Sequence, residues 1–327
     1  MNKKNIVRFL FLLGICVIVS ICVPNYNVKA TSLEENISVL DEIINTEEKI
    51  MMYDAVTKET TEVDMEELKK VIKAQNNTNS IKSYIPSDIK TYSEVGLPKL
   101  APAEVRASAT SVNRITNTST APYITTCRIA AKNSSGSNVY GTASMVGPNV
   151  ALTCAHCVFD PYNENATYQD WTIYPGFNGT YYYGAACGWS RVYYSNNWYN
   201  NHDGNYDWAI CVLEAYPGVG NFGVQSYGTR AEMYNMNVRV LGYPGDTSYG
   251  FTRDAIYQYE TGEKITTTVT DYQFLYTGWT FGGFSGGPIL RSDNYIVGIH
   301  KGISTSNTPL GVRITQEMIN LIVSASN

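Results

Sequence analysis

The sequence predicts an all-β protein, a sandwich or barrel of short strands, preceded by an N-terminal leader and a helical segment. Two observations divide the chain: 24 of its 26 glycines and 22 of its 26 tyrosines lie after residue 104. A third gives the fold class, because short β-branched and aromatic runs alternate with turn signals from residue 123 onward. Several short strands separated by turns favour a sandwich or barrel over βαβ units.

The charge of the chain follows the same division. Its net charge is −5 and its pI is near 5.3, which argues against non-specific nucleic-acid binding, since that needs a basic face. Residues 31–104 hold 15 acidic residues against 8 lysines, a balance of −7, whereas residues 105–327 have 12 basic and 14 acidic residues, a balance of −2. The acidic character therefore belongs mainly to the segment before residue 105.

Residues 1–30 have the pattern of a secretory signal peptide. Lys3, Lys4 and Arg8 precede an uncharged run over 9–23, and residues 28–30 offer a cleavage site. The run is shorter than the roughly 20 apolar residues that a membrane-spanning helix needs. We expect a secreted, extracellular protein that has no membrane contact once the signal is removed.

Residues 31–104 are predicted to form a helical pro-segment. Ile37, Leu40, Ile43 and Ile44 recur at helical spacing, a connector rich in Asn, Ser and Thr follows at 75–83, and several prolines come after it. A small helical domain or a coiled linker is the alternative. The preceding signal peptide and the change of composition near residue 104 favour a propeptide that is cleaved off at its C-terminal end.

Residues 105–327 form the predicted β body. Candidate strands lie at 123–131, 144–153, 171–174, 238–242, 264–270, 274–276 and 295–300. Only the tail has apolar residues at helical spacing, which predicts a short closing helix over 315–325.

Three short motifs carry the chemistry. They are Leu-Thr-Cys-Ala-His-Cys at 152–157, Asn-Tyr-Asp-Trp-Ala at 205–209 and Gly-Gly-Phe-Ser-Gly-Gly-Pro at 282–288. A serine hydroxyl needs a base within hydrogen-bond reach, and that base needs a third group to orient it. We predict Ser285 as the nucleophile, His156 as the base and Asp207 as the orienting carboxylate. The N–H groups of Gly283 and Ser285 would form an oxyanion hole.

Other residues compete for these roles. His202 lies in a polar loop and is expected at the surface, and Asp203 competes with Asp207. Asp207 is preferred because the apolar residues 208–212 continue it into a buried strand.

These motifs and their order resemble the chymotrypsin-like serine proteases. More narrowly, residues 112–327 are similar to bacterial glutamyl endopeptidases of the V8 group, on the matching stretches 114–118, 174–176, 241–246 and 297–300. The resemblance implies two antiparallel six-stranded β-barrels, at about 120–215 and 225–312, with the triad in the cleft between them. It implies a serine endopeptidase that acts through an acyl-enzyme.

The resemblance also implies a preference for cleavage after Glu, and less so Asp. Thr280 and His300 match the two positions that hold the substrate carboxylate in these proteases, and both side chains can donate hydrogen bonds to an anion. Trp279 stands where trypsin-like enzymes have an Asp. The alternative is that Thr280 only packs and His300 is a satisfied strand histidine. Lys301 and Ile303 depart from the family pattern at the rim of the expected specificity pocket, which bears on the choice between Asp and Glu. The mature N-terminus aligns near Val105, directly after Glu104, so the enzyme could release itself.

Five cysteines remain after export: Cys127, Cys154, Cys157, Cys187 and Cys211. Five is an odd number, so at least one does not pair within the chain. The family bridge from the cysteine after the catalytic His would reach position 141, which is Gly here. We expect no cofactor, and a zinc site is disfavoured because no second cysteine pair accompanies Cys154 and Cys157. Structural calcium bound by loop carboxylates is possible in the family, but no EF-hand-like spacing indicates it here.

Two other classes of protein are alternatives. A secreted α/β-hydrolase esterase would also fit the Gly-x-Ser-x-Gly pattern at 283–287, but that fold needs its Asp and His after the serine. An inactive, protease-like adhesin is the non-enzymatic alternative. The expected partners are protein or peptide substrates and the chain's own propeptide, with no nucleic acid, and the expected state is a monomer.

Overall fold

The computed structural model of the chain describes residues 48–68, 80–93, 112–179, 181–227, 230–247, 251 and 254–326. All of these belong to one compact unit, Glu48–Asn327. The predicted signal peptide, residues 31–47 of the pro-segment and the junction at Val105 lie outside the described residues.

The first barrel is built from six antiparallel strands. In spatial order they are β11 (Gln169–Pro175), β6 (Thr126–Lys132), β7 (Asn138–Gly147), β8 (Val150–Thr153), β14 (Ala209–Leu213) and β13 (Trp189–Ser195). A bridge between Ile173 of β11 and Cys187, two residues before β13, joins the ends of this path and closes the barrel. Its interior is filled by apolar side chains such as Ile129, Val150 and Leu152.

The second barrel also has six strands on its main path. They are β18 (Ile265–Thr268), β19 (Gln273–Tyr276), β22 (Pro309–Arg313), β21 (Tyr295–Ile303), β20 (Pro288–Arg291) and β16 (Val238–Gly242). A bridge between Asn237 and Lys264 closes it. Three short strands add to its margins: β17 (Tyr259–Thr261), β5 (Asn113–Arg114) and β15 (Gly223–Gln225). The prediction of an all-β fold with two six-stranded barrels is confirmed.

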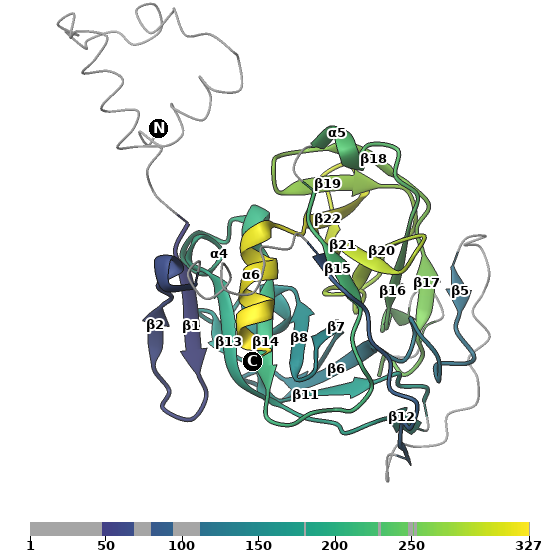
Figure 1. The fold of residues 1–327 in the computed structure, drawn as a ribbon, viewed down its shortest axis with the longest axis horizontal. Coiled ribbons are helices and arrows are strands. Elements are labelled where there is room, and N and C mark those ends of the chain that lie inside the picture. The colour runs from purple at the N-terminus through teal and green to yellow at the C-terminus, as the bar shows by residue number, and fades with distance from the viewer. Residues whose placement is uncertain are drawn as a thin grey trace, which may run out of the picture. The chain divides into compact units, whose positions relative to one another are not determined.

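The predicted closing helix is α6 (Gln316–Ala325), the yellow helix in Figure 1. Thr315 caps its N-terminus by accepting a hydrogen bond from the backbone N–H of Met318. The helix buries Met318, Ile319, Leu321 and Ile322 and packs against β14 and β7 of the first barrel. The remaining short elements are β9 (Phe159–Asp160), β10 (Ala166–Thr167), β12 (Tyr181–Tyr183), α4 (Asn196–Asn201) and α5 (Arg230–Met233).

The described part of the pro-segment has four short strands and a single helical turn, so the prediction of a helical segment is wrong there. It contains β1 (Ile50–Asp54), β2 (Thr60–Glu62), β3 (Ser80–Ile81) and β4 (Thr91–Ser93), with one helical turn at 65–68. β1 pairs antiparallel with β13, with Ile50 opposite Ser195 and Asp54 opposite Arg191. The outer side of β13 supplies a complete row of hydrogen-bonding partners, and such tertiary pairing overrides a weak local helix preference.

The pro-segment also shares the core of the first barrel. Ile50 is 2% exposed and Leu68 is 6% exposed, and both belong to the same buried cluster as the barrel strands. β3 pairs with β15, and β4 pairs with β12. In Figure 1 the β1–β2 hairpin lies beside β13 as an extension of the sheet.

Candidate active site

His156 and Asp207 meet at the ends of two paired strands. His156 lies in the 3-10 helix η1 (Ala155–Cys157), just after β8, and Asp207 follows the 3-10 helix η2 (Gly204–Tyr206), just before β14. β8 and β14 pair with Thr153 opposite Ala209, so the two loops are neighbours. His156 Nδ1 lies 2.7 Å from Asp207 Oδ2, and the backbone N–H of His156 donates to Asp207 Oδ1 at 3.1 Å.

The two side chains stabilise each other's charged forms. Burial acts to raise the pKa of the Asp207 carboxyl, but the charge and hydrogen bonds of His156 outweigh it and the pKa lies below its usual value. Burial likewise acts to lower the pKa of His156, but Asp207 raises it well above its usual value. The pair therefore favours an imidazolium at His156, the species that a general base forms when it takes a proton.

Ser285 lies in the loop between β19 and β20, on the second barrel. Its Oγ donates to the backbone carbonyl of Lys301 at 3.4 Å, and no hydrogen bond between Ser285 and His156 is present among the described residues. Catalytic hydrogen bonds are often loose in free enzymes and tighten when substrate binds. The structure thus brings the nucleophile candidate to the C-terminal end of β21.

Thr142 of the first barrel holds the nucleophile loop of the second. Its backbone N–H donates to the carbonyl of Ser285 at 2.9 Å, and its Oγ1 donates to the carbonyl of Gly283 at 2.8 Å. The same Oγ1 accepts from the backbone N–H of Tyr243 at 3.0 Å. Thr142 is fully buried, so these bonds are shielded from water. No sequence motif marks this residue, since these partners lie more than 100 residues away.

The predicted oxyanion hole has the required backbone shape. Gly283 has a φ of +101°, and a Cβ there would lie 2.2 Å from the carbonyl oxygen of Tyr243, so only glycine fits. Within the described part of the chain, the N–H groups of Gly283 and Ser285 have no hydrogen-bond acceptor. Two free donors in one tight turn suit a developing oxyanion.

Thr280 and His300 also come together. His300 lies on β21 with no exposed surface, and its Nε2 is 2.5 Å from Thr280 Oγ1 while its Nδ1 is 2.7 Å from the hydroxyl of Tyr276. Burial raises the pKa of Tyr276, so its hydroxyl keeps its proton. This buried hydroxyl donates to Nδ1, because no other acceptor for it occurs in the described residues. Nε2 then carries the hydrogen and donates to Thr280.

The charge state of His300 follows from its surroundings. Burial, and then the charge on His156, lower the pKa of His300 to about 3. The imidazole is therefore neutral at any working pH. His300 is satisfied by its two neighbours, as the structural alternative expected, and it still directs an N–H toward the half-buried hydroxyl of Thr280.

The five described cysteines are all free and buried. Cys157 Sγ donates to the carbonyl of Ser285 at 3.4 Å, and Cys154 Sγ donates to that of His300 at 3.2 Å. Ligand atoms of Cys154, His156 and Asp207 lie within 4.8 Å of one another. A metal would need a Cys154 thiolate, yet burial raises the pKa of that thiol, and the other two residues already bond to each other. This donor set does not fit a metal ion.

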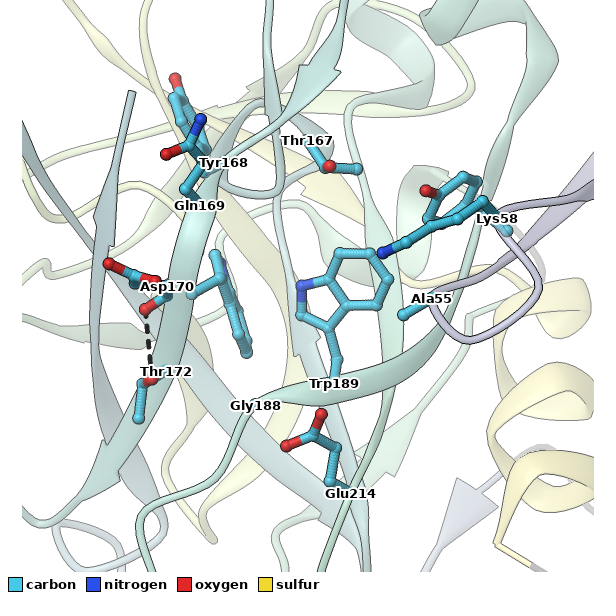
Figure 2. Close-up of a pocket in the computed structure, with 12 residues that line it drawn as sticks. Ala55, Lys58, Thr167, Tyr168, Gln169, Asp170, Thr172, Gly188, Trp189 and Glu214 are labelled. Carbon is cyan, nitrogen blue, oxygen red and sulfur yellow. Dashed lines mark hydrogen bonds between the residues drawn. The ribbon is translucent and has the colours of Figure 1, made fainter. Parts of the chain in front are cut away.

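A cavity of about 450 Å³ lies where the pro-segment meets the first barrel (Figure 2). Tyr53 and Lys58 of the pro-segment line it together with Trp189 and Glu214 of the barrel region. The rings of Tyr53 and Trp189 meet edge to face at 5.8 Å. None of the candidate catalytic residues borders this cavity.

The chain is similar in sequence to known peptidases. Residues 141–299 match the family described as trypsin-like peptidase domain. The chain is 30% identical over 219 residues to a protein named extracellular metalloprotease from Bacillus subtilis strain 168, covering 64% of this chain and 66% of that protein, slightly less than two thirds of its length. It is 28% identical over 258 residues to a glutamyl endopeptidase of Bacillus licheniformis, covering 74% and 76%.

Solved structures show the same fold. A Glu endopeptidase in complex with MPD superposes with a TM-score of 0.57 at 22% identity, over 66% of this chain and 96% of that one. Protease Anisep from Arthrobacter nicotinovorans gives a TM-score of 0.52 at 18% identity, over 66% and 100%. Across the described helices, none is both long and apolar enough to cross a membrane.

The two-barrel fold and the match to the trypsin-like peptidase domain identify a serine endopeptidase of the chymotrypsin fold. Within that class, the chain is similar to the bacterial glutamyl endopeptidases. The α/β-hydrolase alternative is wrong, since the described sheets close into antiparallel barrels.

Proposed function

We propose that the protein hydrolyses peptide bonds with Ser285 as nucleophile, His156 as general base and Asp207 as the residue that orients His156. The observation that carries this proposal is the 2.7 Å contact between His156 Nδ1 and Asp207 Oδ2, which leaves Nε2 of His156 to take a proton. Ser285 Oγ attacks the scissile carbonyl carbon while its proton passes to Nε2. The N–H groups of Gly283 and Ser285 stabilise the resulting oxyanion.

The acyl-enzyme forms when His156 returns that proton to the leaving amine and the peptide C–N bond breaks. A water molecule then repeats the sequence, with His156 taking its proton, and releases the carboxylate product from Ser285. Thr142 supports both halves of the reaction, because its bonds to Gly283 and Ser285 fix the carbonyls on either side of the oxyanion donors.

The substrate backbone would pair with the end of β21. β21 pairs with β20 only as far as Ile299, whereas β22 accompanies it to Ile303. Residues 301–303 therefore keep one free side, and the carbonyl of Lys301 on that side already accepts a hydrogen bond from Ser285 Oγ. An extended peptide can add to such an edge as a further strand, which would bring its carbonyl to the nucleophile.

Cleavage after Glu, and less so after Asp, is the specificity that the Thr280–His300 pair supports. Thr280 offers a hydroxyl and His300 a neutral N–H, both of which donate to a carboxylate. In the free protein His300 Nε2 donates to Thr280 Oγ1 at 2.5 Å, so the hydroxyl hydrogen of Thr280 stays available for a carboxylate. A bound carboxylate would also draw the imidazole N–H away from Thr280, without needing a charged imidazole. A glutamyl endopeptidase among the relatives agrees with this assignment.

We also propose that the chain is exported with residues 1–30 as signal peptide and is matured by cleavage before Val105, after a glutamate. The enzyme's own specificity would then release residues 31–104. Sequencing the N-terminus of the secreted product from cells expressing the wild type and Ser285→Ala tests this. A start far from residue 105, or the same start in both proteins, would contradict self-release.

Peptides that differ only in the residue before the cleaved bond test the specificity. With Glu, Asp, Gln and Arg at that position, kcat/KM should be highest for Glu, lower for Asp and near background for Gln and Arg. Equal turnover of the Arg peptide would refute the carboxylate pocket.

Labelling with a fluorophosphonate tests the nucleophile separately. Ser285→Ala and His156→Ala should lose labelling and lower kcat by about 10⁴-fold or more. Ser306→Ala, an exposed serine beyond β21, should keep both. Labelling that survives in Ser285→Ala would assign the nucleophile elsewhere.

A further inference from the structure

A second cavity, of about 510 Å³, borders the candidate active site directly. It lies between the loop of the first barrel that carries Asp207 and the end of β21. His156 and Asp207 form part of its wall, and Tyr168 and Trp198 give it apolar sides. Its size is within the range of pockets that enclose small ligands, so it can take a whole amino-acid side chain.

Lys301 brings a positive charge into this cavity. Its ammonium lies against Gly204 of η2, so closely that a Cβ on Gly204 would be 2.0 Å from Lys301 Nζ. Among the described residues this ammonium has no hydrogen bond or ion pair. A buried or half-buried cation without a partner favours an anion that arrives with a ligand.

The other charged groups of the cavity leave this cation uncompensated. Asp207 is the single carboxylate in the lining, and both of its oxygens are taken up by His156. Lys301 contributes to the lowered pKa of Asp207, after the larger effects of burial and His156. His202, the other basic residue in the wall, pairs through Nε2 with Asn165 Oδ1 at 3.0 Å. Among the residues that line the cavity, the Lys301 ammonium is therefore available to bind an anion, and no carboxylate is available to neutralise it.

The direction of Lys301 fixes which substrate residue it meets. His300 and Lys301 are adjacent on β21, yet His300 contacts Tyr276 and Thr280 inside the second barrel while Lys301 reaches Gly204 of the first. Adjacent residues of an extended peptide also point to opposite sides. When the residue that is cleaved places its side chain at Thr280, the residue before it faces Lys301.

We propose that this cavity is a second acidic subsite, in which Lys301 binds the carboxylate of the substrate residue immediately before the one that is cleaved. The proposal rests on the function proposed above and names its substrate class: segments with two consecutive acidic residues. Tyr168 and Trp198 would pack on the methylene groups of a glutamate, and the Lys301 ammonium would donate to its carboxylate.

Matched peptides test the subsite. The residue at the cleaved position is Glu throughout, and the residue before it is Glu, Gln, Ala or Lys. For the wild type, kcat/KM should be about tenfold higher with Glu than with Gln, mainly through KM, as for one partly shielded charge-assisted hydrogen bond. The ratio should fall as salt is added.

Three variants locate the effect, each judged by its own Glu-to-Gln ratio, so that any general loss of activity cancels. Lys301→Met should bring the ratio near one, and Lys301→Glu should bring it below one and favour Lys. Gly204→Ala, which pushes the ammonium aside, should reduce the ratio while leaving Lys301 in place. Lys264→Met, an exposed cation on the second barrel away from this cavity, should keep the wild-type ratio.

Two results would overturn the subsite: a wild-type ratio of one, or a ratio unchanged in Lys301→Met. Neither touches the proposed function, provided that the peptides are still cleaved after Glu and that the protein is still labelled by the fluorophosphonate. Absence of both cleavage and labelling in the wild type would instead refute the proposed function, and the subsite with it.

Discussion

Replacing Gly141 with cysteine should create a disulfide bond with Cys157. Gly141 lies in β7, opposite Ile129 of β6. A Cβ at this position would lie 3.1 Å from Cys157 Sγ, and no left-handed backbone angle opposes a side chain there. An S–S bond of about 2.05 Å places the Cβ of one cysteine roughly 3 Å from the sulfur of the other, so this placement allows a bridge without movement of the strands.

The expected gain comes from the loop that the bridge closes. Residues 141 and 157 are 16 positions apart in the sequence, and closing a loop of that length stabilises the folded state by about 3 kcal/mol. The bridge removes the hydrogen bond from Cys157 Sγ to the carbonyl of Ser285, which costs about 0.5 to 1 kcal/mol. The net gain of about 2 kcal/mol corresponds to a rise in Tm of roughly 4 to 8 °C for a domain of this size.

Thermal unfolding of Gly141→Cys under oxidising and reducing conditions measures this gain. Mass spectrometry of the oxidised protein after digestion should find the two cysteine peptides linked. The double variant Gly141→Cys, Cys157→Ser keeps the new side chain but cannot form the bridge, so its Tm should not depend on the redox conditions. The reasoning is refuted when the cysteines of oxidised Gly141→Cys remain unlinked, or when its Tm is the same in both conditions.

Two further predictions concern pH. Asp207 raises the pKa of His156 well above its usual value. Because the base must be neutral to accept a proton, kcat/KM should fall as pH drops through that raised pKa. In Asp207→Asn this fall in kcat/KM should occur at lower pH, and the maximal kcat/KM should be about 10⁴-fold lower. Burial raises the pKa of Glu48 from 4.5 to about 7, so the folded state favours the protonated carboxyl, and this stabilisation is complete below pH 4.5 and lost as pH rises to 7. Denaturant unfolding at pH 5 and pH 8 measures this effect: between the two pH values, Glu48→Gln should lose roughly 2 to 3 kcal/mol less of its free energy of unfolding than the wild type. Glu59→Gln, which removes an exposed carboxylate of the β1–β2 hairpin, should behave as wild type. Equal losses in all three proteins would contradict the raised pKa of Glu48.

The short motifs around His156, Asp207 and Ser285 could be recognised in the sequence because each is contiguous and adjoins a strand end. The sequence marks the residue type and its local turn, and the pairing of β8 with β14 then brings His156 to Asp207. The same holds for Thr280 and His300, which were identified from resemblance and meet at 2.5 Å. These residues could be predicted because each lies in a short contiguous motif, although the motifs themselves are far apart in the chain.

Other parts of the site depend on contacts between distant segments. Thr142 looks like any strand threonine until Gly283, 141 residues later, meets its hydroxyl. Tyr276 is one of 26 tyrosines, and only the fold shows that it sets the hydrogen position on His300. Strand β1 has no alternating pattern of its own, because its conformation is imposed by β13. Sequence periodicity carries no record of such partners.

The pairing of β1 with β13 has a consequence for the maturation proposed above. Removal of residues 31–104 would strip five residues of β13, opposite Ile50–Asp54, of their hydrogen-bonded neighbour. A bare strand with unpaired N–H and C=O groups is a template for another chain. Arg191, within this stretch, adds a charge that opposes stacking of identical copies. Maturation would thus exchange a self-contained precursor for a protease that is more prone to aggregate, and the pro-segment would serve as a solubility device until the moment of release.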